Sequence, residues 1–592
     1  MGMPDPIPRG AGALEGPSRI RPIVGLAVVF AVAFAIRLVG INWALPAVIH
    51  HDERNVGLAV LKALFSGEPC PTFYYYPALA VFSHYVSAVV AFMVGKHYGL
   101  LGRLTDLRLP DYLPYARFAS ALAGALTVLV VAKTARDVRR GAGIPAGLVA
   151  TFGFISVLHS HYATPDASLT LFVQLALLFS FLSLSRRSLR SSFWAAAFAS
   201  LAASFKYTAF LAIIPAILAA VLIEPKGNRI SRATQVAAVG LAIFAVINIG
   251  GIIELPVLID HVRAEAVHYF QAGNLGVPGV SCENPRGVMF HVRAALGDVG
   301  YVAAGLAILG IITCASSRLG RFFLLASLAF VVPHLALFAS ARAAFPRNVL
   351  PLTPSIAILA GVGIARVAES VRTKSLRPKV IALVTGLAIL LPARATLLND
   401  YVMTRDCSLT KVQEWFIRNG ERVGGVGYRV ASLHSLWTPR TVGARDLSIG
   451  EVFLERLKNQ KRLPDPAWFL EQGAVFFTIE RWGVVRYSGL DWPDRMLGLI
   501  REHCVWVGAI SGWPPDARWF PNSGFAAPDV GSDTFFGPTV EIFMLKPAFF
   551  PPQTGAGWPR VGHLRGCVCC MHPRGAIGPA TNIGLSGCGF VK

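Results

Sequence analysis

Long apolar stretches dominate the first two thirds of the chain. The first covers residues 23–45, which at 1.5 Å per residue is enough to cross the ~30 Å hydrocarbon core of a bilayer. Backbone groups in lipid find partners only within their own segment, so each run that crosses is predicted to be helical. Eleven more runs follow, near residues 78–95, 115–132, 144–162, 166–185, 191–205, 208–223, 235–255, 299–315, 322–341, 348–365 and 379–393.

Positive charge sets the predicted orientation of these helices. The positive-inside rule places gaps rich in Lys and Arg in the cytoplasm. Five gaps qualify, namely residues 133–140, 186–190, 226–232, 318–321 and 366–379. The outer face then receives residues 159–166, Lys206, residues 256–298 and residues 342–347.

The charge pattern conflicts with a crossing at residues 78–95. An inner N-terminus allows two crossings before Lys133, whereas three apolar runs are present. The middle run contains Ser83, His84 and Ser87, so we predict that it lies along the outer interface as an amphipathic helix. The fold class predicted is a polytopic α-helical membrane protein with about eleven transmembrane helices.

Mixed polar and apolar sequence replaces the long runs near residue 399. Residues 474–479 and 539–545 have the pattern of strands, and residues 411–418 and 495–503 that of helices. A small extracytoplasmic α/β domain is predicted. The predicted boundaries are a cytosolic stub at 1–22, a transmembrane domain at 23–398 with outer loops 46–114 and 256–298, the soluble domain at 399–550, and a disordered tail at 551–592.

Composition supports the membrane assignment. Of 592 residues, 54% are hydrophobic and 15% charged, and the mean hydropathy is +0.54, which argues against a soluble globular enzyme. The net charge of +22 lies in the gaps between apolar runs rather than on one face, so no nucleic-acid partner is predicted. Nine scattered cysteines predict no disulfide framework.

Two acidic sites fall on the predicted outer face. Asp52 and Glu53 directly follow the first apolar run, and Asp166 ends the outer segment that begins at His159. Carboxylates at these places suit activation of a hydroxyl acceptor. They also suit capping of the helices that follow, and both interpretations stay open.

Cations and histidines share this face. Lys206 and Arg347 lie at outer helix ends, where they suit a phosphate-bearing lipid headgroup or simple snorkelling to the interface. A divalent metal is left open, because His50, His51, His159 and His161 could cluster with Asp52, but their spacing matches no fixed ligand pattern and no metal ligand is assigned. The tail offers a weaker zinc alternative, with Cys567, Cys569, Cys570, His572 and Cys588.

The order of these features resembles the C-type glycosyltransferase superfamily, in the branch that contains the protein O-mannosyltransferases and the lipid A aminoarabinose transferase. The resemblance covers about residues 20–420. The matching elements are Asp52-Glu53 with the helix at 57–67, Tyr76-Pro-Ala-Leu, Arg117-Phe-Ala-Ser-Ala-Leu-Ala-Gly-Ala-Leu-Thr, His161-Tyr-Ala-Thr-Pro-Asp166, Ser204-Phe-Lys-Tyr-Thr, Arg347-Asn-Val-Leu-Pro-Leu-Thr-Pro, and residues 400–419 ending in Glu-Trp-Phe-Ile-Arg-Asn.

The resemblance implies transfer of a sugar from a polyprenyl-phosphate carrier to a protein, lipid or glycan acceptor on the outer face, with inversion. Asp52 would be the base, accompanied by Glu53, and Asp166 the second acidic position. Lys206 and Arg347 match basic positions near the carrier phosphate, and His51, Tyr76 and His161 are assigned to substrate binding. The expected location is a bacterial inner membrane, with the C-terminal domain extracytoplasmic and no cofactor apart from the open metal.

One departure and two alternatives qualify this expectation. Where the aminoarabinose branch has Glu-Lys-Pro, this chain has Tyr75-Tyr76-Pro77, which favours a neutral hexose or pentose only slightly.

A transporter would place its functional charges near the membrane midplane, whereas the acids here gather at outer helix ends. A protein that only binds polyprenyl phosphate is the third hypothesis.

Overall fold

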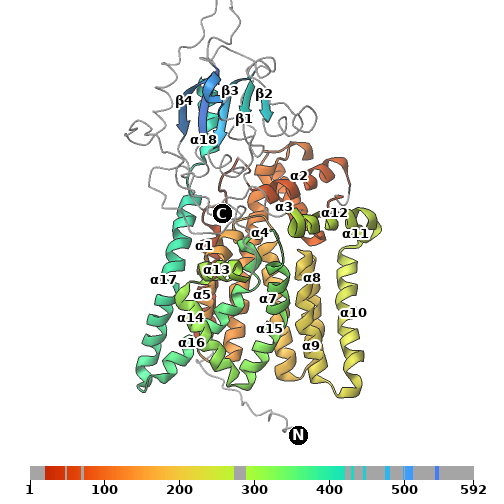
Figure 1. Cartoon of the computed structure of the whole chain (residues 1–592), viewed down its shortest axis with the longest axis vertical. Coiled ribbons are helices and arrows are strands. Elements are labelled where there is room, and N and C mark those ends of the chain that lie inside the picture. The colour runs from red at the N-terminus through yellow and green to blue at the C-terminus, as the bar shows by residue number, and fades with distance from the viewer. Residues whose placement is uncertain are drawn as a thin grey trace, which may run out of the picture.

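A bundle of long helices carries a small β-sheet at one end (Figure 1). The computed structural model describes residues 20–46, 48, 50–68, 72–272, 288–419, 429–432, 445–448, 474–480, 498, 500–510 and 540–545. The predicted stub and tail, and the centre of the predicted outer loop at 256–298, therefore lie largely outside the described residues.

The first half of the bundle begins at Ile20. Its helices are α1 (Ile20–Leu38), α2 (His51–Ser66), α3 (Ala78–His97), η1 (Leu104–Asp106), α4 (Leu109–Val138), α5 (Gly143–Thr151), α6 (Phe154–Ser160), α7 (Asp166–Arg186), α8 (Leu189–Ala203), η2 (Tyr207–Ala212) and α9 (Ile213–Ile223).

The second half continues to Asn419. Its helices are η3 (Lys226–Asn228), α10 (Arg229–Ile247), α11 (Ile249–Ile253), α12 (Leu255–Val267), η4 (His268–Ala272), α13 (Val288–Val299), α14 (Tyr301–Ala315), α15 (Arg318–Ala339), η5 (Pro346–Val349), α16 (Thr353–Ser370), η6 (Lys374–Leu376), α17 (Arg377–Met403) and α18 (Ser408–Asn419).

The predicted polytopic membrane architecture is confirmed. Within the described residues, six helices are long and apolar enough to cross a membrane, or up to eight if each sharply bent pair counts as one span. The bent pairs are α5 with α6, at 63°, and α13 with α14, at 106°. The expected number of eleven crossings stays a prediction.

Close helix contacts in the bundle depend on glycine. At the crossing of α14 and α16, a Cβ on Gly310 would lie 2.0 Å from the carbonyl oxygen of Leu359, and one on Gly363 would lie 2.1 Å from that of Leu306. Small residues let helix backbones approach in this way where lipid supplies no hydrophobic drive. The helix α16 is thereby buried along residues 357–365.

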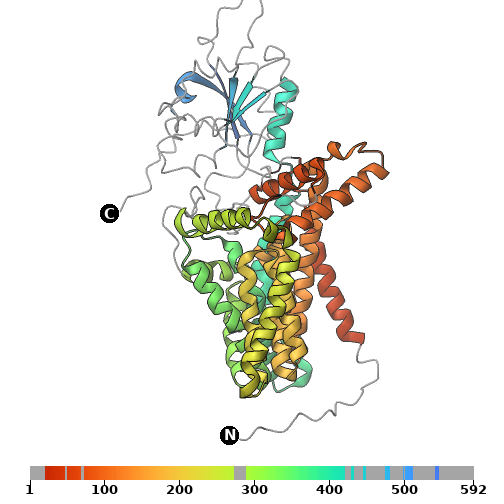
Figure 2. The same ribbon diagram turned by 90° about the vertical axis from the view of Figure 1, so that its right-hand side faces the viewer.

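Several helices lie across the sheet-bearing end of the bundle. Figures 1 and 2 show α2, α3 and α12 there, above the ends of the long helices. Length and composition alone would let α3 span a membrane. Its placement at the end of the bundle instead agrees with the interfacial position predicted for residues 78–95.

The strands form one mixed sheet. They are β1 (Arg429–Ser432), β2 (Arg445–Ser448), β3 (Ala474–Glu480), β4 (Cys504–Ile510) and β5 (Val540–Leu545), in the order β2-β1-β3-β5-β4. β1 is parallel to β2 and β3, whereas β5 is antiparallel to β3 and β4. The helix α18 packs against β4 and β5, as a small α/β unit requires.

The last long helix extends beyond residue 398, and the predicted end of the transmembrane domain there stays a prediction. α17 continues through Met403, past the boundary expected at residue 398. The helix continues because its last turn is buried: Asn399 and Asp400 are 3% and 2% exposed.

Cysteine labelling tests the orientation. α4 has 30 residues, about 45 Å of helix, so Gly102 before it and Arg140 after it are predicted to lie on opposite sides of the bilayer. Both positions are exposed. We expect Gly102→Cys to react with a membrane-impermeant maleimide from outside, and Arg140→Cys to react only after the membrane is opened. The reverse pattern would overturn the predicted orientation.

Candidate functional site

A buried ion pair anchors the first turn of α2. Arg117 of α4 donates from Nε and Nη2 to the two carboxylate oxygens of Glu53, at 2.9 and 2.8 Å, and both side chains are inaccessible to solvent. The Ala163 backbone N–H donates to the same carboxylate at 2.7 Å. Burial alone would raise the pKa of Glu53, but Arg117 and these hydrogen bonds outweigh it and hold that pKa below its usual range.

Arg117 also ties down the segment between α1 and α2. Its Nη1 donates to the carbonyls of Ile41 and Trp43, at 3.0 and 2.9 Å, and its guanidinium lies 4.3 Å from the centre of the Trp43 ring. Glu53 is therefore fully engaged by partners in the interior. This geometry lets Glu53 position the start of α2, and its predicted place beside the base stays a prediction.

Asp52 faces a different neighbour. Consecutive helical residues point about 100° apart, so the anchoring of Glu53 directs Asp52 elsewhere. Arg347 of η5 donates from Nη1 to Asp52 Oδ2 at 2.5 Å, and 16% of the Asp52 side chain is exposed. The N-cap position of α2 is held by His50, whose side chain makes no capping hydrogen bond.

Asp166 forms a second ion pair. Lys206 donates from Nζ to Asp166 Oδ1 at 3.1 Å, and the Asp166 side chain is 3% exposed. Asp166 is the first residue of α7 and its side chain makes no capping hydrogen bond. Asp166 is therefore not the N-cap of α7, which is Pro165, whereas Asp52 and Glu53 lie in the first turn of α2, where a negative charge suits the helix N-terminus.

Arg347 joins the two ion pairs into one site. Its guanidinium interacts electrostatically with Asp52 first and with Asp166 next, and together they raise its pKa well above the ordinary value despite burial. Burial lowers the pKa of Lys206, but Asp166 more than compensates and raises it. Two carboxylates and two cations from four distant segments thus balance one another in charge.

Tyr76 connects this site to a large apolar cavity. Burial and the nearby Asp52 carboxylate raise the pKa of the Tyr76 hydroxyl well above its ordinary value. Tyr76 also lines a cavity of about 1060 Å³ between α3 and the α10–α12 region. Its walls include Phe73, Phe82, Tyr207, Phe244 and Ile252.

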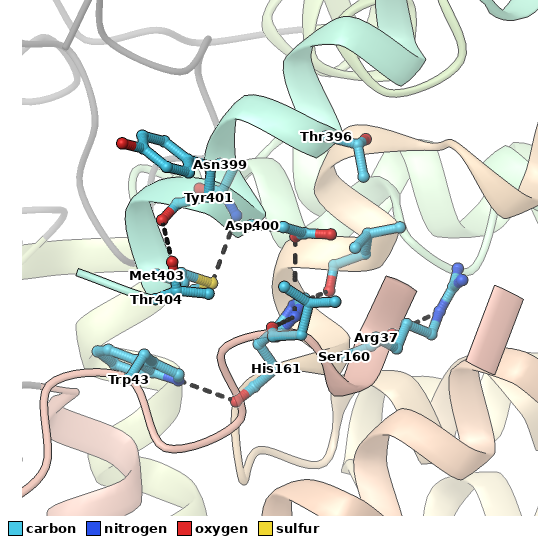
Figure 3. A network of polar contacts seen from close by, with 12 residues as sticks. Arg37, Trp43, Ser160, His161, Thr396, Asn399, Asp400, Tyr401, Met403 and Thr404 are labelled. Atoms are coloured by element: carbon cyan, nitrogen blue, oxygen red, sulfur yellow. Dashed lines mark hydrogen bonds and ion pairs between the residues drawn. The ribbon is translucent and has the colours of Figure 1, made fainter. Parts of the chain in front are cut away.

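His161 is engaged by the fold itself. Nδ1 lies 2.9 Å from the carbonyl oxygen of Val157, and Nε2 lies 2.8 Å from that of Val39. Nε2 is also 3.7 Å from Asp400 Oδ1 at the end of α17 (Figure 3). Both ring nitrogens therefore lie beside protein atoms, and the substrate contact predicted for His161 stays a prediction.

The remaining predicted residues are placed as follows. His51 begins α2, but its side chain lies outside the described part of the chain. No group of three or more His, Cys, Asp or Glu side chains that could hold a metal occurs among the described residues. The cysteines of the tail lie outside that part.

The segment that begins at Arg117 was one of the matching elements in the sequence, but Arg117 itself was given no role there. The available signal was a single cation inside an apolar run, because a buried guanidinium requires a buried carboxylate partner. The partner itself could not be identified, since Glu53 lies 64 positions away.

Removing one partner of the Glu53–Arg117 pair should destabilise the protein. We expect Glu53→Gln to cost about 3–5 kcal/mol, because it leaves a buried guanidinium without its counter-charge. The measurement is the thermal unfolding of purified protein. The control is Asp137→Asn, which removes a partly exposed pair with Lys133 on α4 and should cost less than about 1 kcal/mol.

The depressed pKa of Glu53 also predicts that the stability difference between wild type and Glu53→Gln depends on pH. Because the pKa of Glu53 is depressed in the folded state, its stabilising contribution is present at neutral pH and is lost as the pH falls through the folded pKa. The stability gap between wild type and Glu53→Gln should therefore narrow on acidification. A gap that stays constant would contradict the anchoring role.

Known proteins share this fold and part of this sequence. Residues 113–250, which include Arg117, Asp166 and Lys206, match the model of the family described as dolichyl-phosphate-mannose-protein mannosyltransferase. No curated protein sequence matches the chain. The apo oligosaccharyltransferase of Archaeoglobus fulgidus is 12% identical, with a TM-score of 0.51 over 87% of this chain and 75% of its own.

A second solved structure is similar over a greater length. The apo ArnT of Cupriavidus metallidurans is 14% identical, with a TM-score of 0.49 over 91% of this chain and 100% of its own. The family match on the segment that carries three site residues, in a chain with the oligosaccharyltransferase fold, confirms the resemblance predicted from the sequence. Residues 113–250 are thus similar to the dolichyl-phosphate-mannose-protein mannosyltransferase family, and the chain as a whole has a fold similar to that of the oligosaccharyltransferase.

Proposed function

We propose that this protein transfers a sugar from a polyprenyl-phosphate carrier to an acceptor hydroxyl, with Asp52 as the general base and with inversion. The observation that carries this proposal is the site's arrangement. Asp52, a partly exposed carboxylate, is held by Arg347 beside the Asp166–Lys206 pair, and Tyr76 links them to a large apolar cavity. An acid, two cations and an apolar recess are what a lipid-linked donor requires.

The cavity fits the carrier. Aromatic and aliphatic side chains line most of a volume of about 1060 Å³, which suits an isoprenoid chain. The cavity meets the charged site at Tyr76, so a chain lying in it would place its phosphate near Arg347 and Lys206. The matching family is named for a dolichyl-phosphate-linked donor, which supports the same donor class here.

Arg347 can hold the base and the phosphate together. Its Nη1 is bonded to Asp52, whereas its Nε is buried and without a hydrogen-bond partner among the described residues. A planar guanidinium presents donors in a fixed fork that matches phosphate oxygens. Lys206 adds a second positive charge for the phosphate as it leaves.

The reaction needs one bond made and one broken. The acceptor oxygen attacks the anomeric carbon, the bond from that carbon to the carrier phosphate breaks, and Asp52 takes the hydroxyl proton. The phosphate departs with the bonding electrons, and Arg347 and Lys206 compensate its charge. Attack opposite the leaving phosphate inverts the anomeric centre.

The acceptor remains a protein, lipid or glycan on the extracytoplasmic side of a bacterial inner membrane. The sheet of β1–β5 lies at the same end of the bundle as α2 (Figure 1), which bears Asp52. An acceptor bound by that region would have a short path to the base. The predicted domain at 399–550 is proposed to select it.

Replacement of Asp52 tests the base. With a panel of polyprenyl-phosphate sugars, release of polyprenyl phosphate should fall by about 10²–10⁴-fold in Asp52→Asn, because the amide cannot accept the proton. The matched control is Asp260→Asn on α12, an exposed carboxylate at the same end of the bundle, which should keep wild-type turnover. Unchanged turnover in Asp52→Asn would remove Asp52 from this role.

Replacement of Lys206 tests the phosphate subsite. Lys206→Gln should weaken binding of polyprenyl phosphate on the order of tenfold, since a charge-assisted hydrogen bond is lost. Lys62→Gln, at an exposed position of α2, changes the net charge equally and should leave affinity unchanged. Equal affinities for both variants, measured on folded protein, would exclude Lys206 from the subsite.

A further inference from the structure

A group of neutral polar side chains beside the two ion pairs has no use in the mechanism above. Each is at most 5% exposed, and each has a side-chain nitrogen or oxygen without a hydrogen-bond partner in the described part of the chain. The group comprises His50, His159, Tyr162, Thr164 and Asn348. Buried polar atoms are normally paired, because desolvation is costly without a partner. Several such atoms close to one another, as ring contacts show for His50, Tyr162 and His159, indicate a ligand.

Aromatic contacts hold part of this group together. The Tyr162 ring lies 4.6 Å from the ring of His50 and 5.3 Å from that of His159, centre to centre. The Asp166 carboxylate and the Arg347 guanidinium act electrostatically on both imidazoles. The two histidines therefore lie beside the ion pairs that bind the donor in the proposed function.

Asn348 approaches from η5. It follows Arg347 directly, and its backbone carbonyl accepts a hydrogen bond from His334 Nε2 at 2.8 Å. Its side-chain amide, 3% exposed, keeps both Nδ2 and Oδ1 without partners among the described residues. The backbone is thus fixed while one donor and one acceptor remain available.

The spacing of His159 and Asp166 suits a bridging hydroxyl. His159 Nδ1 lies 4.0 Å from Asp166 Oδ2, too far for a hydrogen bond. If an oxygen lay about 2.8 Å from both atoms, the angle at that oxygen between Nδ1 and Oδ2 would be about 90°, which is compatible with two hydrogen bonds. A hydroxyl there donates to the carboxylate and accepts from the imidazole, which an ammonium or a phosphate cannot both do.

The group favours an uncharged ligand. Its members are neutral amides, hydroxyls and imidazoles, and burial lowers the pKa of His50, which favours its neutral form. The Asp166 charge is already balanced by Lys206. An ammonium placed beside Asp166 would meet the Lys206 cation, whereas sugar hydroxyls would not.

We propose that His50, His159 and Asn348 form a wall that recognises the hydroxyls of an uncharged hexose on the donor, with one hydroxyl bridging His159 and Asp166. This inference rests on the proposed function and deepens it. It assigns sugar recognition to this wall and leaves the carrier phosphate to Arg347 and Lys206. Mutations in the wall should therefore weaken binding of the sugar without weakening binding of the carrier phosphate.

The test compares carriers with and without a sugar. Full-length protein is titrated with polyprenyl phosphate and with its mannose, glucose, galactose and 4-amino-arabinose conjugates. In wild type, at least one hexose conjugate should bind about 5–20-fold more tightly than bare polyprenyl phosphate. The increase in affinity should be smaller for the 4-amino-arabinose conjugate. His159→Phe and His50→Phe should abolish that gain and leave the affinity for polyprenyl phosphate unchanged.

Controls separate recognition from folding. His97→Phe makes the same change at an exposed position of α3 and should keep the full gain, whereas His159→Gln, which can still hydrogen-bond, should restore part of it. For the preferred hexose, the monodeoxy donor that lacks the bridging hydroxyl should lose affinity in wild type but not in His159→Phe. Unfolding temperatures confirm that each variant is folded.

The outcomes are distinguishable. A hexose gain that persists in both Phe variants overturns this inference, and so does a wild type that binds every conjugate no better than bare polyprenyl phosphate. Turnover with any donor in either case leaves the proposed function standing. Absence of turnover with all donors removes the proposed function itself.

Discussion

The buried pair of Glu53 and Arg117 is the interaction on which the site depends. Arg117 binds both oxygens of Glu53, two backbone carbonyls of the segment after α1, and the face of Trp43. A charge without a partner in this solvent-free place would be strongly destabilising, so the segment, the start of α2 and α4 are fixed together. Asp52 is one residue from this anchor, and its direction follows from the anchor through helix geometry.

The two neighbouring acids of α2 therefore have different environments. Glu53 is enclosed, and its pKa is held low by its partners. Asp52 is partly exposed and shares Arg347 with Asp166. In the proposed function the carrier phosphate would meet the Nε of Arg347, which has no hydrogen-bond partner among the described residues, while Nη1 stays on Asp52. That arrangement would link donor binding to the state of Asp52 through Arg347.

A second link joins the membrane bundle to the region beyond it. His161 contacts backbone carbonyls of α6 and of the segment after α1, and Asp400 approaches it from the last turn of α17 (Figure 3). The loop between His161 and Asp166 is thus held close to the helix that leads to α18.

The sequence by itself determined the helices, the acidic positions and the cations. Apolar length requires helices in lipid, and the runs near residues 115–132, 166–185 and 322–341 correspond to α4, α7 and α15. It also indicated Asp52, Asp166, Lys206 and Arg347, because charges at helix ends stand out against apolar surroundings. Only the tertiary structure decided which of them meet. Asp52 and Arg347 are 295 positions apart, and no local pattern encodes a contact made by packing distant helices. The same packing placed backbone carbonyls beside both nitrogens of His161 and left those of His159 without hydrogen-bond partners among the described residues, although the two histidines are two residues apart.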